Sequence, residues 1–398
     1  MNKSTPAYIT GIGIISAIGD NVAENCTALT EERAGIAPAT YLQTIHPFPV
    51  GEIRYSNEEL AKIAGVLPTF PRTALLSIIA AKEAFAPFIG KTEGLKAGVI
   101  SANTVGGMDL SETMFESVAE RKAMDKRKLW YHECGSITEL TAYAIGLEDA
   151  WSTSISTACS SSANTIMLGA QLIEQGKLDI VIAGGADSLS KFTLNGFNSL
   201  MILDKELCRP FDENRQGLNL GEAAAYVVLM SERAVAQTGA AKRAILSGYA
   251  NANDAHHQTA SSPDGTGNQL AMAGALAQAG LQPGDIDYIN LHGTGTANND
   301  SSEGIAIEKV FEGYTIPEAS STKAYTGHTL GAAGSVEAVF SVLAIEKQVT
   351  WPHLRMQTPI SSLNWQPSTQ SVAKPIRNVL SNSFGFGGNC SALVISKA

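Results

Sequence analysis

Apolar residues along this chain fall into short continuous runs and into longer stretches with helical spacing. Residues 8–16 and 97–101 are apolar runs that contain small residues, a pattern typical of strands buried on both faces. Between them, residues 71–88 are rich in alanine and leucine and are predicted to be helical. Further strands are predicted at residues 178–187, 223–230, 245–250 and 286–291, and in two runs joined at 384–388.

Helical stretches alternate with these strands, which favours an α/β protein with a mostly parallel sheet covered on both faces. Residues 108–121 and 269–279 are predicted helices, and a third follows Asp300, which we expect to be its N-cap. A buried helix carries Val336, Val339, Phe340, Leu343 and Ala344 at helical spacing. Both halves of the chain open with a strand and a small-residue turn, and both later pass from a polar turn into a buried helix. We therefore predict an internal duplication, with halves at residues 1–238 and 239–398.

The composition indicates a compact globular protein of 398 residues, with 44% hydrophobic and 17% charged residues. A net charge of −10 argues against nucleic acid as the main partner, because phosphate binding needs clustered lysine and arginine. The basic segment 121–128 is interpreted as a solvated face. No apolar run approaches the ~20 residues needed to span a bilayer. The N-terminal residues lack the apolar core of a secretory signal, so we expect a cytoplasmic location.

Cysteine and glycine patterns argue against bound cofactors. The five cysteines include no CxxC pair, which makes a disulfide framework or structural zinc improbable. His132, Glu133 and Cys134 resemble metal ligands by type only, since adjacent residues of a strand point to opposite faces. The pair Gly11 and Gly13 lacks the third glycine and the acidic residue of a dinucleotide-binding loop.

The strongest chemical signal is the segment 154–162, where a β-like run ends and a helix is predicted to run to Gly176. Cys159 lies at this turn, where free backbone N–H groups and the helix dipole favour negative charge. We therefore expect a lowered pKa for its thiol, since the thiolate is the nucleophilic form. A small buried hydrophobic residue is the alternative interpretation, and this segment alone does not decide between them.

Two histidines of the second half complete a candidate site. His292 and His328 each lie in a glycine-flanked turn, and such turns gather at strand ends in this fold class. Two Nε2–H groups can donate to one carbonyl oxygen and stabilise negative charge on it. Lys323 could hold a histidine or a carboxylate nearby, with Glu337 as its best candidate partner. For each histidine alone, a satisfied core or loop residue is the alternative.

The glycines around Phe386 would allow backbone N–H groups to approach a substrate oxygen. A tight hairpin turn is the alternative for this segment.

Taken together, these segments resemble the β-ketoacyl-acyl-carrier-protein synthases, which are condensing enzymes of the thiolase-like fold. The resemblance covers most of the chain and is densest after Cys159. It implies a duplicated fold with two mixed, mostly parallel sheets in a layered α-β-α-β-α arrangement. It is carried, in order, by residues 157–161, 209–212 with 221–222, 292–296 with 299–300, 321–323 with 327–334, and 382–388.

The resemblance also implies an activity. Cys159 would take an acyl chain from acyl carrier protein as a thioester. His292 and His328 would bind the malonyl thioester carbonyl and stabilise the enolate that forms on decarboxylation. The resulting carbanion would attack the Cys159 thioester and extend the chain by two carbons. No metal or nucleotide is needed, because the substrates are carried on the phosphopantetheine of acyl carrier protein. A homodimer is typical, and a heterodimer with a related subunit is possible.

Supporting roles follow from the same resemblance. The backbone N–H groups of Cys159 and Phe386 would form an oxyanion hole, and Phe386 would also gate the acyl chain. Lys323 and Glu337 would form a supporting ion pair. Two hydroxyl side chains, those of Thr294 and Thr296, would bind the pantetheine arm.

Two departures from the family pattern point to a specialised synthase, for a polyene or polyketide-like chain. Residues 131–151, which in the family line the acyl pocket and the dimer seam, do not follow the usual pattern. Asn389 and Cys390 stand where the family usually has threonine and asparagine. Two other activities remain as alternatives. A thiolase acting on coenzyme A thioesters would use a second catalytic cysteine with one histidine. A chain-length-factor subunit would lack the nucleophile.

Overall fold

The computed structural model describes residues 6–121, 123 and 126–398. The ten strands of this part of the chain form one hydrogen-bonded sheet. The strand order is β3-β2-β4-β5-β1-β6-β10-β9-β7-β8. The strands are β1 (Ala7–Ser16), β2 (Ala97–Ala102), β3 (Trp151–Ile155), β4 (Ile180–Asp187), β5 (Ala223–Met230), β6 (Ala244–Asn253), β7 (Tyr288–Asn290), β8 (Glu318–Ser320), β9 (Asn378–Phe384) and β10 (Asn389–Ser396). The strands predicted from the apolar runs are confirmed.

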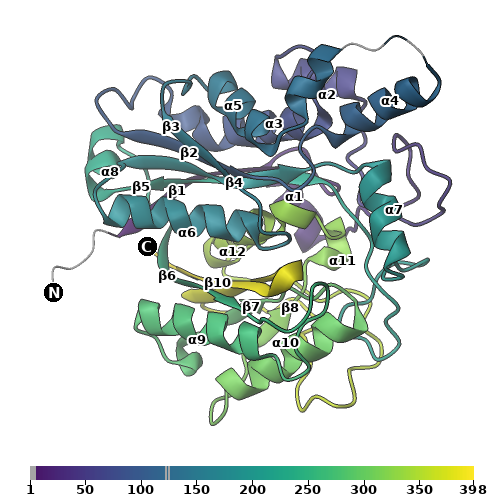
Figure 1. Ribbon diagram of the computed structural model, residues 1–398. Helices are drawn as coiled ribbons and strands as arrows, with labels where there is room; N and C mark the ends of the chain where they lie inside the picture. The colour runs from purple at the N-terminus through teal and green to yellow at the C-terminus, as the bar shows by residue number, and fades with distance from the viewer. Residues whose placement is uncertain (1–5, 122, 124–125) are drawn as a thin grey trace.

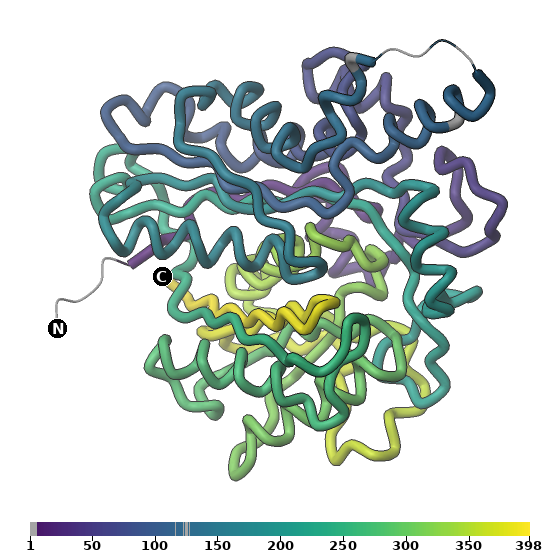
Figure 2. The backbone as a smooth tube through the Cα atoms, in the orientation of Figure 1, coloured from purple at the N-terminus to yellow at the C-terminus, as the bar shows by residue number. Residues whose placement is uncertain are grey.

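The strand order reveals the duplication. Counted within its own half, each set of five strands has the order 3-2-4-5-1. The sheet is mixed: among the described residues, four strand pairings are parallel and five are antiparallel. The two sheets expected from the sequence are joined, because β1 and β6 pair over three residues. These two strands occupy equivalent edges of the two halves, so the edges meet and hydrogen-bond (Figure 2).

Helices cover both outer faces and fill the space between the halves, which gives the predicted five layers (Figure 1). α3 packs on β1 and β5, α6 on β4, α12 on β5 and β9, and α9 on β6 and β10. The helices are α1 (Val22–Thr30), α2 (Asn57–Ala64), α3 (Arg72–Phe85), α4 (Met108–Ala119), α5 (Cys134–Ala144), α6 (Ser161–Glu174), α7 (Lys191–Ser199), α8 (Glu232–Thr238), α9 (Thr266–Ala279), α10 (Ala297–Val310), α11 (Lys323–Thr326) and α12 (Ala333–Lys347). None of the described helices is long and apolar enough to cross a membrane.

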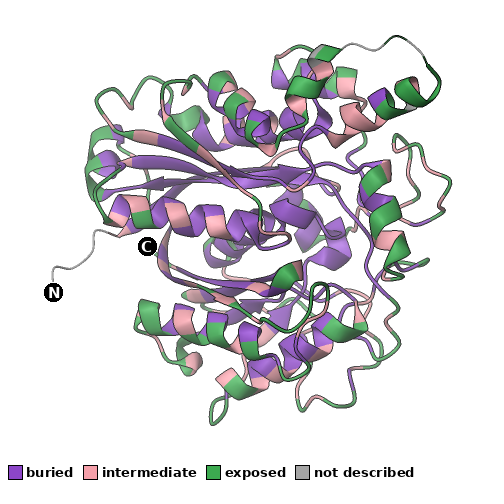
Figure 3. Ribbon diagram, in the orientation of Figure 1, coloured by how far each residue is buried: buried purple, intermediate pink, exposed green. Residues whose placement is uncertain are grey.

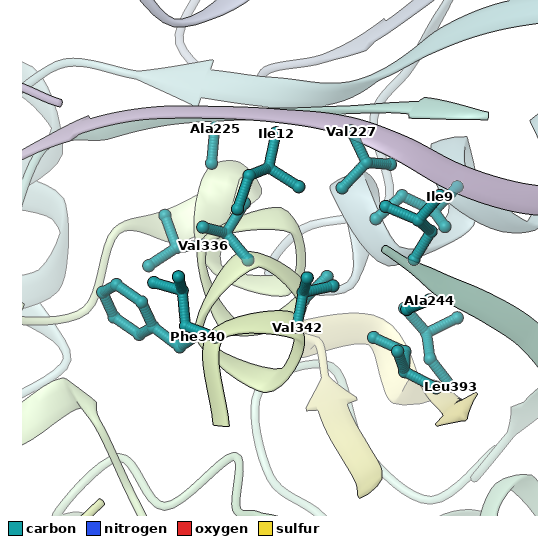
Figure 4. Packing of buried hydrophobic residues seen from close by; sticks show 14 of the residues in the cluster. Ile9, Ile12, Ala225, Val227, Ala244, Val336, Phe340, Val342 and Leu393 are labelled. Atoms are coloured by element: carbon teal, nitrogen blue, oxygen red, sulfur yellow. The ribbon is translucent and has the colours of Figure 1, made fainter. Parts of the chain in front are cut away.

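The central layer between the two sets of strands is largely buried (Figure 3). α12 is buried from Ala333 to Ile345, on all sides of the helix. Its side chains Val336, Phe340 and Val342 pack between residues of the first half and Leu393 of β10 (Figure 4). Burial of apolar area is the main favourable contribution to the free energy of folding. The packing of this layer therefore holds the two halves of the chain together.

Two details of the fold correct or explain sequence features. Asp300 is not the N-cap of its helix, because α10 begins one turn earlier and Thr296 is the cap. Gly11 and Gly13 are packing residues of β1: a Cβ on Gly13 would lie 2.1 Å from the carbonyl oxygen of Ala80 on α3. Side-chain-free positions are therefore required there for the close approach of a helix to the sheet.

Candidate active site

Cys159 lies in the predicted turn between β3 and α6. The turn is tight, because Ala158 adopts a φ of 54°, in the left-handed region that is unfavourable for a residue with a Cβ. Cys159 is 5% exposed, and Ser160 occupies the N-cap position of the helix that follows, without a side-chain capping bond. The strained backbone thus presents the sulphur to the interior, towards the second half of the chain.

The expected low pKa of Cys159 is wrong. Burial raises the pKa of its thiol to about 11, because the charged thiolate is poorly solvated there. The Lys323 charge and the Phe386 N–H, which donates to the sulphur, act in the opposite direction without overcoming burial. The sequence showed the helix start but not the complete burial of the turn against the other half.

The structure brings Cys159 together with both predicted histidines. His292 follows β7, and His328 follows α11. The Nε2 atom of His328 lies 3.0 Å from the Cys159 Sγ, and the reactive atoms of all three residues lie within 4.8 Å of one another. The two imidazole rings meet edge to face, with centroids 5.5 Å apart. The nucleophile candidate and the histidines therefore share one buried centre built from both halves.

Hydrogen bonds at Nδ1 fix the tautomer of each histidine. Lys323 Nζ lies 3.2 Å from the Nδ1 of His292, and the Leu330 N–H donates to the Nδ1 of His328 at 3.3 Å. With a donor facing each Nδ1, the proton of each neutral ring resides on Nε2. Burial and the Lys323 charge hold the pKa of both histidines well below the usual value of 6.5. Both rings therefore carry an Nε2–H donor in this buried centre.

Lys323 contacts both groups that the sequence proposed for it. Its ammonium group donates to Glu337, to the His292 Nδ1 and to the His292 carbonyl oxygen. Lys323 and Glu337 are 3% and 2% exposed. Burial raises the pKa of Glu337 to about 7, and Lys323 opposes that shift. A buried pair of this kind is strongly coupled to its surroundings, because removing either partner leaves an unpaired charge.

The cysteine and the two histidines also have the composition of a zinc site. A histidine that binds zinc through Nε2 normally carries its proton on Nδ1 and donates it to an acceptor. Here both Nδ1 atoms face donors instead, the Lys323 ammonium and the Leu330 N–H. The arrangement therefore favours hydrogen-bond donation to a substrate oxygen over coordination of a cation.

Two cavities meet at Cys159. One, of about 400 Å³, is lined by His292, His328, Thr294 and Thr296. The two threonine hydroxyls lie 2.9 Å apart. The second, of about 370 Å³, is mainly apolar, and its lining includes Val105, Met108, Phe192, Leu200 and Leu330. Within the described residues, 131–151 do not contribute to the lining of this second cavity.

Phe386 separates the two cavities and lines both. Its ring stacks on that of Phe197 of α7, with centroids 5.9 Å apart and planes 16° apart. The Phe386 N–H also faces the Cys159 sulphur. The backbone and the side chain of Phe386 therefore both lie where the two cavities meet.

Comparison with known proteins identifies the family. Residues 76–234 match the beta-ketoacyl synthase N-terminal domain, and residues 243–357 match the C-terminal domain. This chain belongs to the β-ketoacyl synthase family. It is 32% identical to 3-oxoacyl-(acyl-carrier-protein) synthase 2 of Coxiella burnetii, over 98% of both chains. It is 31% identical to the synthase of the same name from Staphylococcus aureus, over 100% of this chain and 99% of that one.

Solved ketosynthases share the architecture. The ishigamide ketosynthase/chain length factor superimposes with a TM-score of 0.91 at 28% identity, over 100% of both chains. The ketosynthase ApeO, solved in complex with its chain length factor ApeC from Xenorhabdus doucetiae, gives a TM-score of 0.86 at 31% identity. That match covers 100% of this chain and 99% of the other. The predicted thiolase-like fold is confirmed.

Buried carboxylates that sequence reasoning did not assign hold the histidine turns of this β-ketoacyl synthase. Glu303 accepts hydrogen bonds from the N–H groups of His292 and Gly293, each at 2.8 Å. Asp300 accepts a hydrogen bond from the Thr294 N–H at 3.0 Å. Asp187 accepts the N–H of Gly331 at 2.7 Å. Asp300 and Glu303 are three residues apart, so they share a helix face, and that spacing was a usable signal.

Two sequence features lie outside this centre. His132 bonds the Ser111 hydroxyl through Nδ1 at 2.8 Å, and Cys134 begins α5, so the segment 132–134 is not part of the metal-like cluster found in the described residues. The basic segment 121–128 falls partly outside the described residues, at 122 and 124–125.

The raised thiol pKa predicts a steep pH profile for chemical modification. In the free enzyme, the rate of Cys159 alkylation by iodoacetamide should rise about tenfold per pH unit from pH 7 to 9.5, since the thiolate fraction does so below a pKa of about 11. Peptide mapping by mass spectrometry measures the rate at Cys159 itself, with Cys134 as an internal reference. A plateau near pH 7 would instead indicate an acidic thiol.

Proposed function

We propose that this chain is an elongating β-ketoacyl-acyl-carrier-protein synthase in which Cys159 holds the acyl chain while His292 and His328 act on the malonyl group. The observation that carries the proposal is the pair of neutral histidine donors whose reactive atoms lie within 4.8 Å of each other and of a buried thiol. Two such donors stabilise an enolate oxygen without supplying a proton, which is what a decarboxylation step requires. The relatives named as 3-oxoacyl-acyl-carrier-protein synthases support the substrate class.

The first half-reaction loads the cysteine. The Cys159 sulphur attacks the carbonyl carbon of an acyl thioester, and the carbonyl oxygen becomes an oxyanion that accepts the N–H groups of Cys159 and Phe386. The carrier's C–S bond then breaks, and the proton of Cys159 ends on the departing pantetheine sulphur. The net change is an exchange of thioesters, with the acyl chain in the apolar cavity.

The second half-reaction forms the carbon–carbon bond. The malonyl C–C bond breaks, carbon dioxide leaves, and the electron pair passes to an enolate whose oxygen accepts the Nε2–H groups of His292 and His328. The enolate carbon then attacks the Cys159 thioester, the C–S bond breaks, and the expelled thiolate takes up a proton from solvent to restore the resting thiol. Lys323 keeps His292 in the donor tautomer, and Glu337 balances its charge. Thr294 and Thr296 line the other cavity and would hold the pantetheine arm.

Both alternative activities are less well supported by the geometry. A thiolase needs a second reactive cysteine, and Cys390 also lines the first cavity. Its thiol donates to Asn268 at 3.2 Å, and Cys390 is not a member of the cluster formed with the two histidines among the described residues. A chain-length factor lacks the nucleophile, whereas Cys159 is present and contacts His328.

A specialised acyl chain, a dimer and a cytoplasmic location belong to the same proposal. The solved ketosynthases with chain length factors are the neighbours that favour a polyene or polyketide-like chain. Dimer formation has a candidate surface at the edge strand β3, where Trp151 is 47% exposed. Trp130 is a second large exposed side chain, at 79%. We propose a homodimer. Co-purification of a related subunit that lacks the nucleophilic cysteine would instead indicate a heterodimer.

Reconstitution tests both levels of the proposal. The protein, malonyl carrier and acyl carriers of matched length, one saturated, one polyunsaturated and one aryl-primed, should give β-ketoacyl products two carbons longer. We expect the unsaturated or aryl-primed carriers to react at least about tenfold faster in kcat/KM, a difference of about 1.4 kcal/mol in transition-state binding. Intact-mass analysis of the carrier measures the products. Equal or faster use of the saturated chain would overturn the specialised assignment, and no product with any carrier would overturn the synthase assignment.

A further inference from the structure

Asn389 is the first residue of β10 and directly follows the Phe386–Gly388 turn. Its side-chain Oδ1 accepts three hydrogen bonds: from Ser160 Oγ at 2.7 Å, from Asn164 Nδ2 at 2.9 Å and from Asn251 Nδ2 at 2.7 Å. Ser160 is the N-cap of α6, and Asn164 lies in the first turns of that helix. A single amide oxygen of the second half is therefore bonded to the start of the helix that follows the nucleophile.

The backbone of the same segment is fixed at its other end. The Gly385 N–H donates to the Asn389 carbonyl oxygen at 2.8 Å, which closes the turn that carries Phe386. Gly385 lies directly on the nucleophile turn, because a Cβ there would be 2.8 Å from the Thr157 carbonyl oxygen and 3.2 Å from the Cys159 nitrogen. The Phe386 N–H thus lies between Gly385 and Asn389, which both contact residues 157–164.

We propose that Asn389 is a positioning residue of the oxyanion hole. Through its hydrogen bonds with Ser160 and Asn164, Asn389 holds the Phe386 N–H against Cys159. The inference rests on the proposed function. The family's usual threonine would place its hydroxyl oxygen one bond closer to the backbone than the Asn389 Oδ1 that accepts these three hydrogen bonds. An oxyanion hole depends on donors that are held in place before the reaction, so a small displacement of one donor lowers the rate.

The three donors do not depend on Asn389 for their only partner. The single hydroxyl proton of Ser160 has a second acceptor within reach, the Thr157 carbonyl oxygen at 2.8 Å from Oγ, and Asn164 Nδ2 also donates to Thr157 Oγ1 at 2.9 Å. Asn251 Nδ2 also donates to Ser391 Oγ at 3.0 Å. Loss of the Asn389 amide therefore leaves no buried donor without an acceptor. We expect it to change the position of the Phe386 N–H more than the free energy of unfolding.

The test separates the two half-reactions. In Asn389→Leu, acyl transfer from acyl carrier protein to Cys159 should slow about 10-fold to 100-fold, because it uses the Phe386 N–H. Malonyl carrier decarboxylation, which uses the histidine donors, should stay within about twofold. The ratio of the two rates in one sample does not depend on the fraction of folded protein. Asn389→Asp keeps an acceptor at the same reach and should recover most of the acylation rate, whereas Asn389→Thr should behave like the leucine variant in a milder form.

Asn378→Leu is the matched control, since Asn378 begins β9 and bonds Asp285 and Ser396 away from the cavities. It should leave both rates unchanged. Equal loss of both half-reactions in Asn389→Leu, or loss of neither, would overturn this inference alone while the wild-type enzyme still condenses chains. A wild-type chain that is neither acylated nor able to condense would overturn the proposed function and this inference together.

Discussion

Cys159→Ala should abolish chain extension while leaving malonyl decarboxylation measurable. Without the sulphur, no acyl-enzyme forms, and the enolate generated beside His292 and His328 has no thioester to attack. We expect condensation to fall by about 10⁴-fold or more, as for other enzymes that lose their nucleophile. Decarboxylation should persist, because the two donors His292 and His328 remain in place, together with Lys323, which keeps His292 in the donor tautomer. Carbon dioxide release and β-ketoacyl product are measured in the same reaction.

Cys26→Ala is the matched control for this experiment. Cys26 is a buried cysteine of α1 that lines neither cavity, and the substitution also removes a buried sulphur. It should retain the wild-type condensation rate. A Cys159→Ala protein that still extended chains would remove the enzyme mechanism proposed for this chain, and it would favour a subunit that assists another synthase.

His328→Ala should show the reverse separation of the half-reactions. The substitution removes one of the two Nε2–H donors that face the malonyl carbonyl oxygen. Malonyl carrier decarboxylation should therefore fall by about 10²- to 10³-fold, the usual cost of losing one donor to a developing oxyanion. Acylation of Cys159 should be partly retained, since its oxyanion accepts backbone N–H groups. Stopped-flow acyl transfer and labelled carbon dioxide release measure the two rates.

His132→Ala provides the comparison, because His132 is exposed and bonds only the hydroxyl of Ser111 among the contacts described for its side chain. It should leave both rates unchanged. If His328→Ala lost acylation and kept decarboxylation, the roles of the histidine pair and the backbone donors would have to be exchanged.

Local patterns were enough to predict most elements of this fold. The apolar runs at 97–101, 178–187 and 223–230 became buried strands, because continuous hydrophobic runs of that length suit a sheet covered on both faces. The end of a helix was harder to place: Asp300 has the chemistry of an N-cap, but Thr296 takes that role. The Asp300 carboxylate instead accepts hydrogen bonds from N–H groups of the turn after His292. It also accepts one from the Phe211 N–H at 2.8 Å, a contact across 89 residues of chain that no local pattern records.

The composition of the site was predictable, whereas its electrostatics were not. Cys159, His292 and His328 could be chosen because each lies in a small-residue turn and the segments around them match a family pattern. The pKa of Cys159 depends on how completely the second half covers the turn, which sequence spacing does not reveal. The same is true of Asn389, whose partners Ser160 and Asn164 are more than 220 residues away along the chain.

A protonated, covered sulphur also resists oxidation. Peroxide converts an accessible thiolate to sulfenic acid, so a cysteine that is 5% exposed and has a pKa of about 11 reacts slowly with it. Cys134 is the more accessible thiol, since the other four cysteines are buried, and it lies outside both cavities. Oxidative damage to the resting protein would therefore reach a residue without a chemical role first, and the capacity to build carbon chains would outlast it.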